Sequence, residues 1–175
     1  ANWKGGRVLL HFGAVDWMAD AWVNGIKVGT HTGGYTPFTF DITQALQGKN
    51  NTMTVRVWDP TDKCYIPHGK QVVKPQGIFY TSVTGIWQTV WLENVPENYI
   101  ENLVVTPDVD RALVKVELDF SNQTKDDLYQ VEVSYEGKPV ATGKSINGQA
   151  VELNMPEGFL CWTPDHPFLY DMKVK

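Results

Sequence analysis

The sequence predicts an all-β fold built from β-sandwich domains, and two local features support this prediction. Apolar and polar residues alternate in Ala112–Phe120 and again in Tyr129–Tyr135, as expected of strands that bury one face and expose the other. The dipeptides Asn24-Gly25 and Asn147-Gly148 each separate two short strand-like stretches. Because Asn-Gly adopts positive φ angles at low cost, it is typical of the two-residue turn of a β-hairpin.

Strand-like segments follow one another along most of the chain. Their apolar residues recur with the short period of a strand, and almost no segment has the longer period of an amphipathic helix. Only Thr43–Leu46 is typical of a helical turn, with Thr43 as its candidate cap. In chain order, the predicted strands are Arg7–Phe12, Ala21–Val23, Ile26–Val28, Thr89–Leu92, Ile100–Thr106, Ala112–Phe120, Tyr129–Tyr135, Ser145-Ile146 and Ala150–Leu153.

A change in composition near Pro96 predicts a boundary between two domains. Residues 1–96 contain 8 Lys and Arg and 6 Asp and Glu, a net charge of +2, whereas residues 97–175 contain 7 and 14, a net charge of −7. Six of the seven Trp lie in the first segment. Since Pro96-Glu97-Asn98 also separates two predicted strands, we predict one sandwich in residues 1–96 and a second, immunoglobulin-like sandwich in residues 97–175.

Charge and hydropathy argue against several classes of function. The net charge of −5 argues against a nucleic-acid partner, which needs a concentrated basic face. The longest apolar run is the four residues Phe159–Trp162, whereas a membrane-spanning helix needs about 20 apolar residues, so no membrane partner is expected. No basic start followed by an apolar stretch is present, so no signal peptide is expected.

The residue patterns of common metal, nucleophile and phosphate sites are missing from the sequence. The four histidines are scattered, and neither Cys64 nor Cys161 has a neighbour at zinc-ligand spacing. We expect two free thiols there, with a single Cys64–Cys161 disulfide as the alternative. Gly5-Gly6 and Gly33-Gly34 lack the strand–loop–helix context of a phosphate cradle and are expected to form turns. The sequence therefore predicts no metal site and no cofactor.

The segment from Asp59 to Gly85 is the main candidate for a functional loop. It is rich in Pro, Gly and Lys and has no clear strand period, and loops of this length inside a compact domain are usually functional or mobile. Asp59 and Asp62 lie where it begins, next to Trp58. Two interpretations stay open: the aspartates form a turn for backbone reasons, or Asp59 hydrogen-bonds sugar hydroxyls beside an aromatic ring.

Large aromatic residues in turn-rich segments are the second group of candidates. Exposed rings of this kind pack against the apolar faces of sugar rings, although large aromatic side chains also fill cores and interfaces. The candidates are Trp17, Trp58, Tyr65, Phe79, Tyr80 and Trp87.

Three stretches carry recurring motifs in a fixed order. The first, Gly13–Thr43, contains Val23-Asn24-Gly25 and Gly33-Gly34-Tyr35; the second, Gly77–Pro96, contains Gly85-Ile86-Trp87-Gln88; the third is Trp162–Tyr170. Together they resemble the sugar-binding domain and the immunoglobulin-like domain of glycoside hydrolase family 2, which contains β-galactosidases, β-glucuronidases and β-mannosidases.

The resemblance implies a galactose-binding-like jelly-roll sandwich in residues 1–96, without the family's first strands, and an immunoglobulin-like sandwich in residues 97–175, without its last strands. In the family, a TIM barrel follows these domains and carries two catalytic glutamates, one of them in an Asn-Glu dipeptide. This chain contains no Asn-Glu. We therefore expect no catalytic residue here and no hydrolysis by this chain alone, whereas the parent enzyme is expected to be a retaining hydrolase of β-galactosidase type.

The resemblance also suggests which residues meet the sugar. Asp59 best matches an aspartate that reaches the active site in some family members, and Asp62 is the second choice. With Trp58 and Tyr65 they form the predicted substrate-binding set, although Cys64-Tyr65-Ile66 departs from the family pattern.

The expected partners follow from the resemblance. They are a carbohydrate, bound weakly or only together with the barrel, the catalytic domain of the parent chain, and a second copy joined through exposed sheet edges. The parent is expected to be periplasmic or secreted. Two alternatives stay open: a free-standing carbohydrate-binding module and an immunoglobulin-like surface scaffold.

Overall fold

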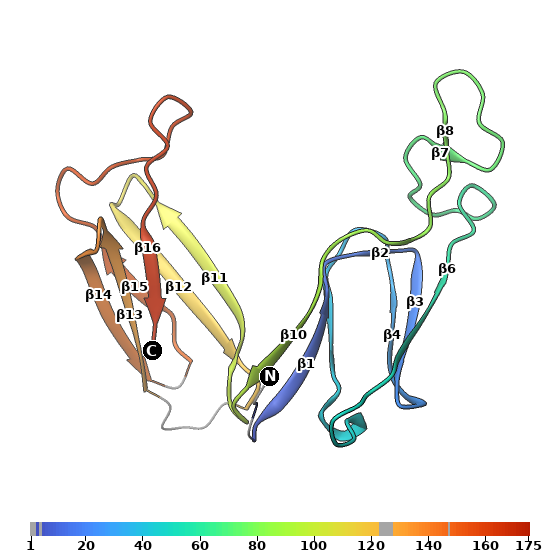
Figure 1. The fold of residues 1–175 in the computed structure, drawn as a ribbon. Coiled ribbons are helices and arrows are strands. Elements are labelled where there is room, and N and C mark those ends of the chain that lie inside the picture. Colours follow the sequence, from blue (N-terminus) through green and yellow to red (C-terminus); the bar gives the residue numbers. More distant parts are fainter. Residues whose placement is uncertain (1–2, 4, 123–127, 147) are drawn as a thin grey trace. The chain divides into compact units, whose positions relative to one another are not determined.

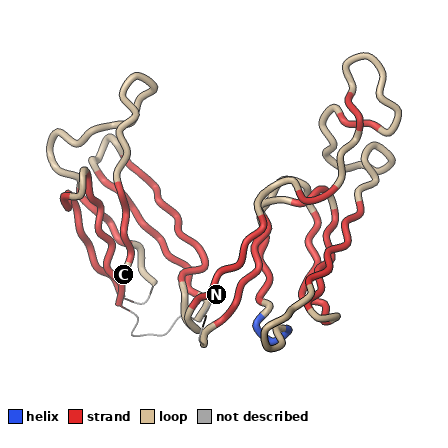
Figure 2. The backbone as a smooth tube through the Cα atoms, in the orientation of Figure 1, coloured by secondary structure: helices blue, strands red, loops and turns tan. Residues whose placement is uncertain are grey.

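The computed structural model describes residue 3 and residues 5–122, 128–146 and 148–175. These residues form sixteen strands and one short 3-10 turn, so the predicted all-β fold is confirmed. They divide into two compact units, residues 1–96 and residues 97–175, each with its own hydrophobic core (Figures 1 and 2). Within the described ranges, no helix is long and apolar enough to cross a membrane.

The first unit is a sandwich of two three-stranded antiparallel sheets, with strand orders β10-β1-β5 and β4-β3-β6. Side chains of both sheets meet in one core around the fully buried Phe12. Its ring stacks on Phe38 at a centroid distance of 4.8 Å and meets Phe40 edge-on at 6.3 Å. The bounds are β1 (Arg7–Phe12), β3 (Met18–Val23), β4 (Ile26–Thr32), β5 (Phe38–Asp41), β6 (Met53–Trp58) and β10 (Val90–Val95).

The Asn-Gly dipeptide of the first unit forms the predicted hairpin turn. Asn24 and Gly25 both have positive φ angles, 51° and 80°, and they join β3 to β4. The Asn24 side chain does more than make the turn: its Nδ2 donates to the Ala45 carbonyl at 2.8 Å, and its Oδ1 accepts the Thr52 N–H at 3.0 Å. The residue therefore ties the hairpin to the loop that precedes β6.

The predicted helical turn exists as the 3-10 turn η1 (Thr43–Ala45), but Thr43 does not cap it. The Thr43 hydroxyl accepts the Val8 N–H at 2.8 Å and lies 2.5 Å from Asp41 Oδ1, which also accepts the Thr43 N–H. The prediction of a Thr43 cap was wrong because this side chain joins the turn to β1 instead.

The outer face of the β4-β3-β6 sheet carries a buried carboxylate with two cationic partners. Asp20 is 3% exposed, and its carboxylate oxygens lie 2.7 Å from Lys27 Nζ and 2.5 Å from Arg56 Nη2. Hydrogen bonds from Lys27, Thr30 and Arg56 hold the pKa of Asp20 well below its ordinary value. Both cations also lie over the Trp22 ring, so they are held in place on this face.

The second unit contains two further three-stranded sheets, β11-β12-β15 and β14-β13-β16. The alternation read from the sequence is confirmed, because Val116, Leu118, Tyr129, Val131 and Val133 are all buried in one core. The predicted turn at Asn147-Gly148 falls partly outside the described residues, since Asn147 is not among them. The bounds are β11 (Ile100–Asp108), β12 (Leu113–Phe120), β13 (Leu128–Tyr135), β14 (Lys138–Ile146), β15 (Val151–Asn154) and β16 (Asp171–Val174).

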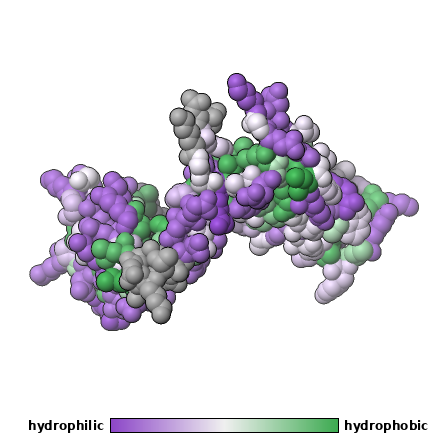
Figure 3. Space-filling model, turned by 90° about the horizontal axis from the view of Figure 1, so that it is seen from below, coloured by the Kyte–Doolittle hydropathy of each residue, from purple (hydrophilic) through white to green (hydrophobic). Residues whose placement is uncertain are grey.

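Apolar side chains also reach the surface of both units, where green patches interrupt the polar surface (Figure 3). In the second unit, Leu169 and Trp162 are exposed and line an open apolar groove of about 510 Å³ together with Val105 and Phe159. Cys64 and Cys161 are exposed free thiols, as expected.

The segment between β6 and β10 is less irregular than the sequence suggests. It contains β7 (Gln71–Val72) and β8 (Tyr80–Thr81), which pair in parallel, and β9 (Gly85–Ile86), which pairs with β2 (Val15–Asp16). These two-residue strands are too short to leave a period in the sequence. Their pairing nevertheless sets the geometry at one end of the first sandwich.

Candidate functional site

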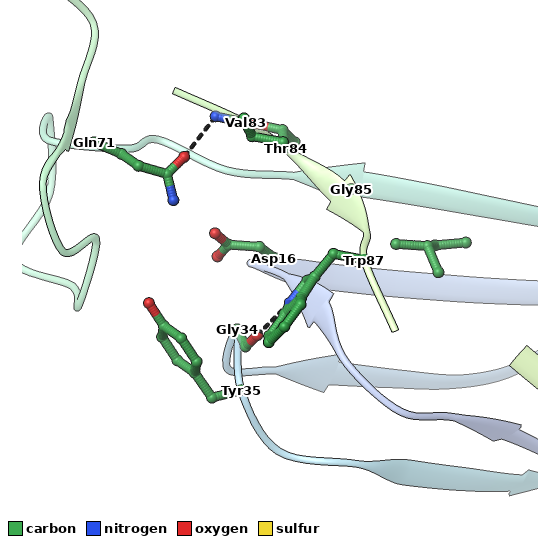
Figure 4. A pocket seen from close by; sticks show the side chains of 9 residues that line it. Asp16, Gly34, Tyr35, Gln71, Val83, Thr84, Gly85 and Trp87 are labelled. Carbon is green, nitrogen blue, oxygen red and sulfur yellow. Dashed lines mark hydrogen bonds between the residues drawn. The ribbon is translucent and has the colours of Figure 1, made fainter. Parts of the chain in front are cut away.

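A cavity of about 280 Å³ lies at the end of the first unit where β2 pairs with β9 (Figure 4). Pairing of Val15 with Ile86 and of Asp16 with Gly85 brings two distant chain segments together. The turn after β4 and the side chain of Gln71 complete the lining. The lining residues are Asp16, Gly34, Tyr35, Gln71, Val83, Thr84, Gly85, Ile86 and Trp87.

Two aromatic rings form the apolar part of the cavity. Trp87 donates its indole N–H to the Gly34 carbonyl at 2.7 Å, which fixes the ring while leaving the residue 50% exposed. Tyr35 packs edge-on against Trp87 at a centroid distance of 6.0 Å and is 59% exposed. Because Trp87 is held by its hydrogen bond and both rings are partly open to solvent, they offer a surface to the apolar face of a ligand.

The carboxylate of Asp16 points into the space between Tyr35 and Gln71 (Figure 4). It is half-buried and has no hydrogen-bond partner among the residues that the structure describes. Burial raises the pKa of Asp16 above its ordinary value, and the charge of Asp59 raises it further. An unpaired, partly desolvated carboxylate is costly to maintain and is characteristic of binding and catalytic sites.

Gly34 makes room for this carboxylate. A Cβ atom at Gly34 would lie 2.6 Å from Asp16 Oδ1 and 3.1 Å from Asp16 Cγ, closer than carbon and oxygen can approach without displacement. The Gly33-Gly34-Tyr35 motif therefore serves the cavity twice: Gly34 admits the Asp16 side chain, and Tyr35 supplies a ring.

Gln71 adds a hydrogen-bond donor. Its side-chain carbonyl Oε1 accepts the Val83 N–H at 2.6 Å, which orients the amide so that its nitrogen remains as a donor (Figure 4). The Tyr35 hydroxyl is a second donor at the edge of the space. Of the described residues that line the cavity, none is Lys, Arg or His, so its polar groups are one carboxylate and neutral donors or acceptors.

Asp59, the first predicted site residue, lies beside the cavity but is engaged within the chain. Its Oδ1 accepts the Thr61 N–H at 2.7 Å, and its Oδ2 accepts the Thr84 hydroxyl at 2.9 Å. The first bond is the turn interaction that one interpretation of the sequence expected. The second connects Asp59 to Thr84 in the cavity wall, so Asp59 holds a lining residue in place without lining the cavity itself.

The other three predicted site residues do not line the cavity. Asp62 is exposed and accepts the Val73 N–H at 3.3 Å. Trp58 is half exposed at the end of β6, where it borders a shallow depression with Met18 and Arg56. Tyr65 is fully exposed next to Ile66 and Pro67. None of the three is among the residues that line the cavity, and their contacts with a sugar stay a prediction.

Sequence reasoning missed Asp16, Tyr35, Gln71 and Thr84 as site residues, whereas Trp87 was one of six aromatic candidates. The Gly33-Gly34-Tyr35 motif was a usable signal, because a glycine pair beside an aromatic residue marks a close approach of chain segments. Asp16 gave no signal of this kind. Its place depends on the pairing of β2 with β9, which no local pattern reveals.

Comparison with known proteins shows that both units resemble parts of glycoside hydrolases. The family model described as glycosyl hydrolases family 2, sugar binding domain, matches residues 1–96, and the model of glycosyl hydrolases family 2 matches residues 98–175. The β-glucuronidase of Rattus norvegicus is 33% identical, with 96% of this chain and 29% of that protein covered. The β-galactosidase of Thermoanaerobacter pseudethanolicus is 30% identical, with 99% of this chain and 24% of that protein covered.

Solved structures agree with these matches. An FMN-binding β-glucuronidase from F. prausnitzii L2-6 has a TM-score of 0.76 at 25% identity, with 98% of this chain and 27% of that chain covered. The β-glucuronidase of Ruminococcus gnavus has a TM-score of 0.77 at 19% identity over 99% of this chain and 30% of that chain, which shows the shared fold. The chain spans less than a third of the length of these relatives. Because the family models together match nearly all of it, the chain belongs to glycosyl hydrolase family 2.

Proposed function

We propose that this chain is a non-catalytic part of a family 2 glycoside hydrolase and that the cavity around Asp16 and Trp87 forms a sugar-binding wall of the substrate cleft. The observation that carries the proposal is the Asp16 carboxylate, which has no hydrogen-bond partner among the described residues, in a cavity lined by two aromatic rings. Carbohydrate sites combine these two features, since a sugar presents both hydroxyl groups and an apolar C–H face.

In this proposal, the cavity residues bind the sugar and residues elsewhere in the parent protein cleave the glycosidic bond. Trp87 and Tyr35 would hold the C–H face of the sugar, and Asp16 would accept hydrogen bonds from its hydroxyl groups. Cleavage would fall to the two glutamates that the family resemblance assigns to a barrel elsewhere in the parent protein. They would act by retention, through a covalent glycosyl-enzyme intermediate. Of the activities in the family, we propose the β-galactosidase type for the parent.

We propose three partners for this chain. Carbohydrate binding by this chain alone would be weak. The catalytic domain of the parent is the proposed second partner, and the apolar groove that contains Trp162 and Leu169 is the candidate surface, because exposed apolar patches of this kind mark interaction sites. A second copy joined through free sheet edges is the third.

The test is saturation-transfer NMR on the 175-residue chain with methyl β-D-galactopyranoside, galactose, mannose and glucuronic acid. We expect weak, saturable transfer corresponding to a dissociation constant of about 1 mM or above. Trp87→Ala should abolish it because the apolar platform is lost. Trp91→Ala is the matched control, since Trp91 is a comparably exposed residue on β10 that lies outside the cavity lining. Absence of transfer with every sugar would contradict the proposal.

The same measurement separates the two groups of candidate residues. If Tyr65→Ala or Trp58→Ala removes the transfer and Trp87→Ala does not, the sugar binds on the loop predicted from the sequence. If Trp87→Ala alone removes it, the cavity is the site. Asp59→Ala is expected to weaken binding indirectly, because it releases Thr84 from its hydrogen bond.

A further inference from the structure

We infer that the cavity accepts a neutral sugar and discriminates against a sugar that carries a carboxylate. The inference rests on the proposed function and adds the substrate class. It follows from the polar groups of the cavity: Asp16 is its charged group, and no Lys, Arg or His stands among the described lining residues.

Recognition of a uronate carboxylate requires positive charge or several convergent N–H donors. The cavity offers one side-chain amide, that of Gln71, and the hydroxyl groups of Tyr35 and Thr84; the Thr84 hydroxyl is already bound to Asp59. Among the side chains, a sugar carboxylate placed here would therefore find one amide donor and a phenol in exchange for its hydration.

Three cations of the first unit are engaged with other partners and do not line the cavity. Lys27 and Arg56 are paired with Asp20 on the outer face of the β4-β3-β6 sheet. Lys70 precedes Gln71 in the chain, but its ammonium group lies over the Tyr80 ring, 5.9 Å from the ring centre, and does not line the cavity. Compensation of a bound negative charge by these side chains would require them to leave their present partners.

Two negative charges, those of Asp16 and Asp59, already act on the cavity. Asp59 stands close enough to Asp16 for its charge to affect the ionisation of that carboxyl. A uronate carboxylate would be a third negative charge in a partly desolvated site, where electrostatic repulsion is stronger than in bulk water. A neutral pyranose avoids this repulsion, because its hydroxyl groups donate to the Asp16 carboxylate in charge-assisted hydrogen bonds.

Named relatives of this chain include both a β-galactosidase and several β-glucuronidases, so membership of the family leaves the substrate class open. The charge of the cavity is an independent criterion, because it belongs to residues of this chain.

The test compares methyl β-D-glucopyranoside with methyl β-D-glucuronide, which differ only in the hydroxymethyl or carboxylate group at C6. Both are titrated into the 175-residue chain at neutral pH and equal ionic strength, with saturation-transfer NMR as the readout. We expect the neutral glycoside to bind about tenfold or more tightly than the glucuronide, the ratio that a modest repulsion between partly screened charges produces.

Asp16→Asn tests the cause of the preference. The substitution keeps the shape of the side chain and removes its charge, so the preference for the neutral glycoside should fall to about threefold or less. Glu93→Gln is the matched control: it makes the same change of net charge in the first unit, but Glu93 is on β10 and lies outside the cavity. It should leave the preference unchanged. A circular-dichroism melt of each variant verifies that it is folded.

The outcomes separate the two claims. Equal or tighter binding of the glucuronide to the wild-type chain overturns the inference while leaving the sugar-binding proposal intact. A preference that survives Asp16→Asn overturns the assignment to Asp16. Binding of neither glycoside overturns the sugar-binding proposal itself, and the inference with it.

Discussion

Replacement of Trp87 by Phe tests whether the aromatic platform of the cavity is held by its indole N–H. Phe keeps an aromatic ring at the position but cannot donate to the Gly34 carbonyl, which now accepts the indole N–H at 2.7 Å. Gly34 is buried, so its carbonyl would lose a partner that solvent does not readily replace. The variant therefore removes one hydrogen bond while most of the ring remains.

The magnitude follows from that bond. A typical intramolecular hydrogen bond contributes about 0.5–1.5 kcal/mol net, and a buried acceptor left unsatisfied costs about 1–3 kcal/mol. Because Trp87 is 50% exposed, water would reach part of the vacated space and offset some of this cost. We expect Trp87→Phe to lower the free energy of unfolding of the first unit by about 1–2 kcal/mol.

The assay is urea unfolding followed by tryptophan fluorescence, which reports mainly on the first unit because six of the seven Trp lie in residues 1–96. Trp91→Phe is the control: Trp91 is 45% exposed and stacks on His11 at 4.7 Å, a contact that Phe can keep. It should change stability by no more than about 0.5 kcal/mol. If Trp87→Phe costs no more than Trp91→Phe, the bond to Gly34 does not hold the ring and the reasoning fails.

Three further predictions concern the cavity and the sheet edges. Burial raises the pKa of Asp16 above its unfolded value of 3.8, so ionisation of this carboxyl lowers the stability of the fold as pH rises through and above that value. Asp16→Asn should therefore raise the urea midpoint at neutral pH and leave it unchanged at pH values below 3.8. A stability gain seen only in acid would contradict this direction. Gly34→Ala places a Cβ 2.6 Å from Asp16 Oδ1, so it should cost about 1–3 kcal/mol and weaken sugar binding in NMR titrations, whereas wild-type binding would show that the carboxylate need not occupy this position. Among the described strands, β11 lies at the edge of its sheet, and such edges should promote self-association through strand pairing, visible in sedimentation as mass that rises with concentration. A constant monomer mass over a wide range of concentration would refute this prediction.

The fold was largely predictable because its signals are local. A strand with one buried face repeats every second residue, so the alternation of Val131 and Val133 with polar neighbours indicates both the strand and its inward side. The Asn24-Gly25 turn is equally local, because the φ angles it adopts depend on those two residues. The cap of η1 was predicted wrongly because the partner of Thr43 lies on β1, far away in the sequence.

The candidate site was predictable only in part. Asp59 drew attention because it begins a long irregular segment, and the structure gives it the hydrogen bonds of a turn and of a support to the cavity wall. Trp87 was recognised as one aromatic residue among several. What sets it apart from Trp58 is its bond to Gly34 and its position beside Tyr35, and both depend on chain segments that are distant in sequence.

By itself, the sequence determined that this protein is all-β and, through its motifs, which family it resembles, since strand periodicity and turn chemistry depend on neighbouring residues. Only the tertiary structure decided where the cavity lies and that Asp16 is its charged group. The physical reason is that β2 and β9 are each two residues long: strands so short have no stability and no pattern of their own, and they form only where the surrounding sandwich holds Val15 against Ile86.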